Sequence, residues 1–135
     1  MTATGHQATV LIIASDPAAR GAWARALEAE RHAVITAAAV ETAVGHAREG
    51  GIDAIVFDAT DRDADGRALM QALDRLPEPP PLVLVSASPR GPELSAHLGA
   101  AAFVPKPCAA EDIVAECHRL LASRTWRAPT EDLEA

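Results

Sequence analysis

The chain has 135 residues, an apolar fraction of 49% and a formal net charge of -7. This length fits one domain that can bury its own core, and the acidic balance argues against nucleic acid or an anionic membrane surface as the main partner. No apolar run is long enough to span a membrane, and the first residues lack a signal-peptide layout. The two cysteines, Cys108 and Cys117, lack metal-ligand spacing and fit a reducing compartment, so we expect a cytoplasmic protein.

Short apolar runs alternate with longer amphipathic segments along the sequence. The runs predict strands, and the segments between them predict helices. The expected strands span residues 8–14, 33–36, 52–58, 82–86 and 101–104. The expected helices span residues 17–30, 41–48, 66–76, 93–98 and 109–123. Such alternation predicts an α/β fold in which helices cover both faces of a parallel sheet. We expect residues 1–7 to be a disordered leader, 8–123 the domain, and 124–135 a polar tail.

The first helix has a clear start and a clear apolar face. Asp16 is a favourable N-cap, and Pro17 suits the first helical position. Trp23 lies on the apolar face of this helix, so we expect it in the core rather than at a ligand. The strand that follows is only weakly apolar, which is typical of a sheet edge.

The third expected strand is the run Ile52–Asp58, which ends on a carboxylate. Its apolar composition is typical of a strand buried on both faces of a parallel sheet. The carboxyl ends of parallel strands line the rim where ligands bind. Ser86 ends the next strand, and Lys106 follows the last one. The twelve Lys and Arg residues include a single lysine, Lys106, which suggests that a compact charge is required there.

These residues and their order resemble the receiver domain of two-component response regulators, over about residues 8–123. The third strand ends on an Asp, and an Asp-Gly pair follows at the family's usual offset. The fourth strand ends on Ser followed by Ala, and an aromatic residue lies three positions before a Lys-Pro pair. The matching residues are Asp58, Asp65-Gly66, Ser86-Ala87, Phe103 and Lys106-Pro107.

The resemblance implies a five-stranded, doubly wound sheet of flavodoxin-like topology, with strand order 2-1-3-4-5 and a cis Lys106–Pro107 bond. It also implies that Asp58 accepts a phosphoryl group from a histidine kinase or phosphotransfer protein. Ser86 and Lys106 would bind the phosphoryl oxygens, and Phe103 would be the switch aromatic that changes a surface for a downstream target protein. Positioning and charge cancellation are what phosphoryl transfer requires. The implied cofactor is Mg²⁺, held by two acidic residues at the end of the first strand.

The acidic pair is where the sequence departs from the family. The two metal positions fall on Ala14 and Ser15, and Asp16 lies one residue later, where it is expected to cap a helix. The remaining metal ligands would be Asp58, the backbone carbonyl of Thr60 and, at most weakly, Asp16, so Mg²⁺ should bind poorly. We therefore expect a settled ion pair between Asp58 and Lys106 rather than a carboxylate poised to accept a phosphoryl group.

Other features suggest weaker alternatives. Residues 61–66 match the opening of a calcium-binding loop, but Ala72 stands where that loop needs Glu, which argues against calcium. Arg62 replaces the family's usual Pro, and prolines shorten the fourth helix, which belongs to a face used for dimers or targets. No Gly-rich loop follows the first strand, so a nucleotide-binding enzyme is disfavoured. Cys117 is expected in the core. Three single histidines are expected at surface positions: His32, His46 and His97.

Two hypotheses remain, both for a non-enzymatic signalling module. In the first, the chain is a phosphorylated receiver in a two-component phosphorelay, with Asp58 as acceptor and impaired dependence on Mg²⁺. In the second, it is a pseudo-receiver, an atypical receiver that binds proteins without phosphorylation. The sequence leaves the partner, the target and homodimer formation open.

Overall fold

A computed structural model describes residues 8–59 and 63–134, and within them five parallel strands form one sheet of order β2-β1-β3-β4-β5. The order confirms the expected topology, and β2 is at the sheet edge as predicted. The strands are β1 (Thr9–Ile13), β2 (Ala33–Ala37), β3 (Ala54–Asp58), β4 (Leu82–Ser86) and β5 (Ala102–Pro105). The expected leader, residues 1–7, lies outside the described residues.

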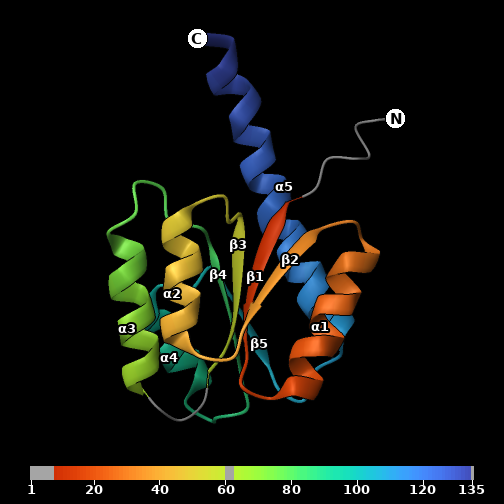
Figure 1. The fold of residues 1–135 in the computed structure, drawn as a ribbon, viewed down its shortest axis with the longest axis vertical. Coiled ribbons are helices and arrows are strands. Elements are labelled where there is room, and N and C mark those ends of the chain that lie inside the picture. The colour runs from red at the N-terminus through yellow and green to blue at the C-terminus, as the bar shows by residue number, and fades with distance from the viewer. Residues whose placement is uncertain (1–7, 60–62, 135) are drawn as a thin grey trace.

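The helices lie in two layers, one on each face of the sheet (Figure 1). They are α1 (Pro17–Ala29), α2 (Val40–Glu49), α3 (Asp63–Asp74), α4 (Gly91–Leu98) and α5 (Ala110–Glu134). Helices α1 and α5 cover one face, and α2, α3 and α4 cover the other (Figure 1). Strand residues alternate between the two resulting cores: Val56 belongs to the α1/α5 core and Phe57 to the other. Trp23 is 5% exposed in the α1/α5 core, which confirms its expected place.

The ends of α1 and α4 follow from local chemistry. The Asp16 carboxylate accepts hydrogen bonds from the backbone amides of Ala18 and Ala19 at 3.3 and 3.4 Å, as predicted for an N-cap. Gly99 ends α4 with a φ of 72°, a left-handed conformation that suits glycine. Helix α4 has only eight residues, which confirms the expected shortening.

Three sequence-based expectations differ from the structure. Helix α3 begins at Asp63 rather than Gly66, and α5 continues to Glu134 rather than ending near Ser123. The α5 extension has no apolar stripe that periodicity could detect, yet each residue other than Pro129 that is added to the existing helix can gain a backbone hydrogen bond. Figure 1 shows this part of α5 projecting beyond the sheet. His32 is not a single surface residue, because its ring contacts His118.

Within the described residues, no helix is both long and apolar enough to cross a membrane.

Candidate functional site

Asp58 and Lys106 form an ion pair at the carboxyl rim of the sheet. The Lys106 Nζ atom lies 3.0 Å from Asp58 Oδ1 and 3.1 Å from Oδ2, so it contacts both carboxylate oxygens. The Asp58 side chain is only 8% exposed, whereas that of Lys106 is 33% exposed. This contact confirms the pair expected from the sequence. A carboxylate this buried depends on its cation, because few water molecules reach it.

The backbone after β5 fixes the position of Lys106. Its amide donates to the Ser86 carbonyl at 2.9 Å, which continues the pairing of β4 with β5. The Lys106–Pro107 peptide bond is cis, as the resemblance to receiver domains implies. The lysine side chain then reaches across the end of β4 to β3, since β4 lies between β3 and β5 in the sheet.

Ser86 occupies the end of β4, beside the ion pair in the strand register. Asp58 is the register partner of Val85, so Ser86 is one residue beyond it toward the rim. The side chain is 2% exposed, and its Oγ accepts a hydrogen bond from the Ser88 amide at 3.0 Å. The structure thus brings Asp58, Ser86 and Lys106 to one edge, although only Asp58 and Lys106 make direct contact among the hydrogen bonds described there.

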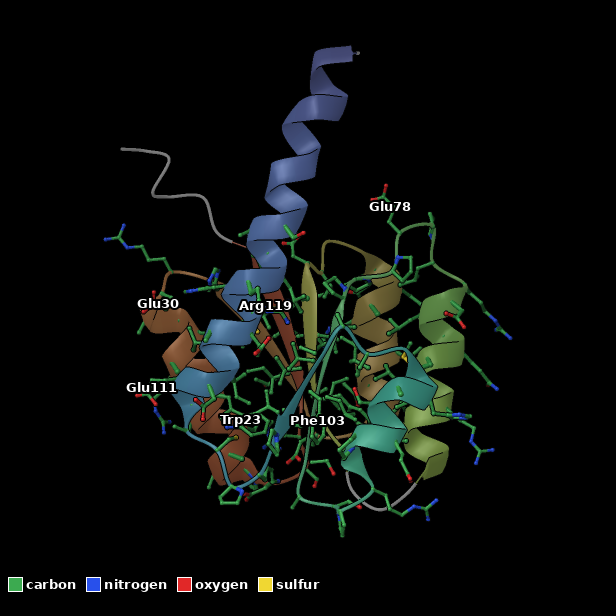
Figure 2. All side chains as sticks on the ribbon, turned by 180° about the vertical axis from the view of Figure 1, so that it is seen from behind. Trp23, Glu30, Glu78, Phe103, Glu111 and Arg119 are labelled. Atoms are coloured by element: carbon green, nitrogen blue, oxygen red, sulfur yellow. The ribbon has the colours of Figure 1, made fainter. Side chains whose placement is uncertain are left out.

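Phe103 is a half-buried residue of β5, labelled in Figure 2, and its ring packs against the first residue of α4. A Cβ atom placed on Gly91 would lie 2.6 and 2.7 Å from ring atoms of Phe103 and 3.5 Å from the Cβ of Ser86. The glycine therefore leaves the space that the ring fills beside Ser86. The sequence did not reveal this role, because Gly91-Pro92 by itself indicates only a delay before the helix.

The end of β1 offers no carboxylate to a metal ion. Ala14 is buried and Ser15 is an exposed hydroxyl residue. Both oxygens of Asp16 accept amide hydrogens of α1, so this side chain is used in capping rather than turned toward Asp58. The remaining candidate metal ligand, the backbone carbonyl of Thr60, lies outside the described residues. The same is true of Arg62 and of the start of the calcium-loop pattern.

The backbone carbonyls of Ala14 and Ser15 bind a cationic side chain, that of Arg20. Nη1 of Arg20 donates to the Ala14 carbonyl at 2.8 Å and to the Ser15 carbonyl at 3.4 Å. The sequence did not reveal this contact either, although an arginine one turn into α1 is within reach of the helix start. A divalent cation at this edge would meet the positive charge of both Arg20 and Lys106.

The described residues do not fit a Mg²⁺ site of the implied kind. Among them there is no group of three or more His, Cys, Asp or Glu side chains that could hold a metal ion. Mg²⁺ requires carboxylate and other oxygen ligands in near-octahedral geometry. Asp58 is the carboxylate at this edge that contacts Lys106, and both of its oxygens take part in that contact.

The surroundings of the Cys108 thiol, which include both members of the ion pair, favour its neutral form. Burial raises the pKa of Cys108, and the negative charge of Asp112 raises it further, while Lys106 acts in the opposite direction. A neutral thiol is a weaker nucleophile than a thiolate, so these surroundings lower the reactivity of Cys108.

Comparison with known proteins gives a family match over most of the chain. The family model of the response regulator receiver domain matches residues 10–118. No curated protein matches the sequence at a significant level.

Solved structures of similar fold are numerous, and the sequence identities are low. The chemotaxis response regulator CheY4 of Vibrio cholerae has a TM-score of 0.76 and 22% identity, covering 86% of this chain and 100% of its own. A CheY-like response regulator receiver domain protein from Methanospirillum hungatei has a TM-score of 0.79 and 21% identity, covering 91% and 100%. The receiver domain of the Francisella response regulator 1452 has a TM-score of 0.77 and 18% identity, covering 87% and 99%. At these identities the structural likeness concerns the fold.

Proposed function

This chain belongs to the response regulator receiver domain family, and from that premise we propose that it works in two-component signalling with Asp58 as phosphoacceptor. In this proposal a carboxylate oxygen of Asp58 attacks phosphorus in line. A new O–P bond forms while the bond from phosphorus to the donor, a phosphohistidine of a partner protein, breaks. The donor nitrogen keeps the electron pair of the broken bond.

The observation that supports the proposal is the contact of Lys106 Nζ with both oxygens of Asp58. A cation held 3.0 Å from the acceptor can follow the developing charge onto the phosphoryl oxygens. Ser86 ends the neighbouring strand, and its hydroxyl would bind a phosphoryl oxygen after giving up the contact with the Ser88 amide. Phe103 and Ser86 both approach Gly91, the first residue of α4, so a movement of Ser86 would affect the start of this helix.

Dependence on Mg²⁺ is expected to be impaired in this reaction. Ala14 and Ser15 replace the acidic pair, and the carbonyls of both residues accept hydrogen bonds from Arg20. Neutralisation of the phosphoryl oxygens then depends on Lys106. Transfer should be slow compared with transfer to a receiver that has the full acidic site.

The missing acidic pair also favours a second candidate function, that of a pseudo-receiver. In that case the Asp58–Lys106 pair is structural, and the surface formed by α4, β5 and α5 binds a partner protein in the same way at all times. This hypothesis differs from the first in one measurable property, namely whether Asp58 forms an acyl phosphate.

The deciding experiment is intact-mass spectrometry after incubation with acetyl phosphate or phosphoramidate, each with Mg²⁺ and with EDTA. The first function predicts a phosphoryl adduct on the wild type that changes little when Mg²⁺ is removed. Asp58→Asn should abolish the adduct. The matched control is Asp53→Asn, since Asp53 precedes β3 at the opposite end of the strand, and it should keep the adduct. No adduct from either donor, in a sample whose circular dichroism shows a folded protein, would favour the pseudo-receiver.

A further inference from the structure

Two histidines distant in sequence meet on the side of the sheet that α1 and α5 cover. His32 lies between α1 and β2, and His118 lies on α5, 86 residues later. Their Nε2 atoms are 3.0 Å apart, and the ring centroids are 5.1 Å apart with an interplanar angle of 61°. Figure 2 labels Glu30 and Arg119, close in sequence to His32 and His118, in the same half of the fold. Both residues are half-buried, and the Nδ1 atom of His32 is itself buried.

The arrangement of the two rings is close to that of two ligands on one metal ion. Imidazole nitrogens bind a tetrahedral Zn²⁺ at about 2.0–2.1 Å, which places two such nitrogens about 3.3 Å from each other. The pair therefore needs to open by only a few tenths of an ångström. In the absence of an ion, a contact between two Nε2 atoms requires one ring to donate a proton and the other to accept it.

We propose that His32 and His118 bind a divalent transition-metal ion of the Zn²⁺, Ni²⁺ or Cu²⁺ class through their Nε2 atoms. Binding requires the donating ring to change tautomer, so that its proton lies on Nδ1 and both Nε2 lone pairs face the ion. No proton is lost from the pair in this step. Because the described residues contain no group of three or more such ligands, water completes the coordination shell. Within the part of the chain that the structure describes, the site is thus an open one with two protein ligands.

Charge and ligand type define which ion fits. The net charge of -7 favours cations near the surface. The guanidinium of Arg119, next to His118, donates to the Glu116 carboxylate at 2.6 and 3.0 Å, so the nearest cation on α5 is neutralised. Imidazole ligands suit Zn²⁺, Ni²⁺ and Cu²⁺, whereas Mg²⁺ and Ca²⁺ prefer oxygen. The site is independent of Asp58, because His32 precedes β2 at the amino edge of the sheet and Asp58 ends β3 at the carboxyl edge.

A bound ion would join α5 to the segment between α1 and β2. These two parts are otherwise linked by the packing of α1 against α5 around Trp23 and Cys117. An ion that binds only the folded state stabilises it in proportion to the logarithm of its concentration. The melting temperature should therefore rise with added ZnCl₂ or NiCl₂ and stay constant with MgCl₂.

The test is isothermal titration calorimetry of the full chain with ZnCl₂, NiCl₂ and CuCl₂ in separate arms at pH 7.5. The wild type should bind one equivalent of at least one of these ions. His32→Gln and His118→Gln should each weaken binding by about tenfold or more, because one of two ligands is lost. Glutamine keeps a polar group at the position of Nε2. Circular dichroism checks that both variants fold. If one of them does not fold, the other still provides an independent test.

The control variants are His6→Gln, His46→Gln, His97→Gln and Cys108→Ser, which remove other potential ligands. Each should bind as tightly as the wild type and show the same rise in melting temperature. Equal affinities for the wild type, His32→Gln and His118→Gln would overturn the proposal. A loss of binding in one of the controls instead would place the ion elsewhere and would overturn it as well.

Discussion

Lys106 crosses the end of β4 to place its ammonium group 3.0 and 3.1 Å from the two carboxylate oxygens of Asp58. The two residues are 48 positions apart, and they do not belong to neighbouring strands. The pair is asymmetric in burial, since the Asp58 side chain is 8% exposed and that of Lys106 is 33% exposed. This asymmetry determines which partner can be removed at low cost.

Lys106→Met should destabilise the protein more than Asp58→Asn does. The first change leaves a buried carboxylate without its cation, at a cost of about 1–3 kcal/mol, whereas the second leaves an ammonium group that water can reach. Urea unfolding followed by circular dichroism measures both, and the double variant completes the cycle. Equal losses for the two single variants would contradict the asymmetry, and additive losses in the double variant would show that the pair is not coupled.

Gly91→Ala should displace the ring of Phe103. The new Cβ would lie within 2.7 Å of the ring, so the ring or the start of α4 must move, at a cost of about 1–3 kcal/mol. NMR of the Phe103 ring protons would report the movement, and the added variant Phe103→Leu should restore much of the stability. Gly45→Ala is the matched control, since a Cβ atom placed on Gly45 would meet no atom within 4 Å and this substitution should stabilise α2 by about 0.5–1 kcal/mol. An unchanged Phe103 spectrum in Gly91→Ala would contradict the contact.

Asp16 should act through its helix cap and not through a metal ion. Asp16→Ala loses the hydrogen bonds to the amides of Ala18 and Ala19 and should cost about 1 kcal/mol of unfolding free energy. Asp16→Ser removes the carboxylate but keeps a capping oxygen, so most of the stability should remain. Thermal unfolding compares the two. A stability of the Ser variant that is as low as that of the Ala variant would assign the effect to charge instead.

Cys117 should make the protein lose stability at alkaline pH. Burial, followed by the charge of Glu116, raises the pKa of this thiol from 9.0 to about 12. Below pH 9 the thiol is neutral in both the folded and the unfolded state, so the contribution of Cys117 to the free energy of unfolding is fully present. Between pH 9 and about 12 the unfolded state alone loses the proton, and stability should fall by up to about 1.4 kcal/mol per pH unit. Urea unfolding between pH 8 and 10.5 measures this slope.

Cys117→Val provides the control for the alkaline slope, because it fills a similar buried volume without a titrating group. The slope should be smaller in this variant by the contribution of one proton. The same slope in both proteins would assign the alkaline loss to other groups. At pH 8, a thiol reagent should modify half-buried Cys108 and leave buried Cys117 unmodified in the folded protein.

The sequence alone predicted the order of strands and helices, because short apolar runs and capping residues are local signals. It placed Asp58, Ser86 and Lys106 at strand ends, and the parallel sheet brings those ends to one rim. The Asp58–Lys106 pair was predictable for the same reason. The Asp16 cap and the buried position of Trp23 were also readable from a few neighbouring residues.

Tertiary structure decided the contacts that have no local signal. The ring of Phe103 fits over Gly91, Arg20 binds the carbonyls of Ala14 and Ser15, and His32 meets His118. Each depends on how a helix is placed against the sheet or against another segment, to within a few tenths of an ångström. Periodicity shows which face of an element is buried, but the packing of whole side chains decides which residues touch. That is why the candidate phosphoacceptor edge could be predicted from the sequence and the histidine pair could not.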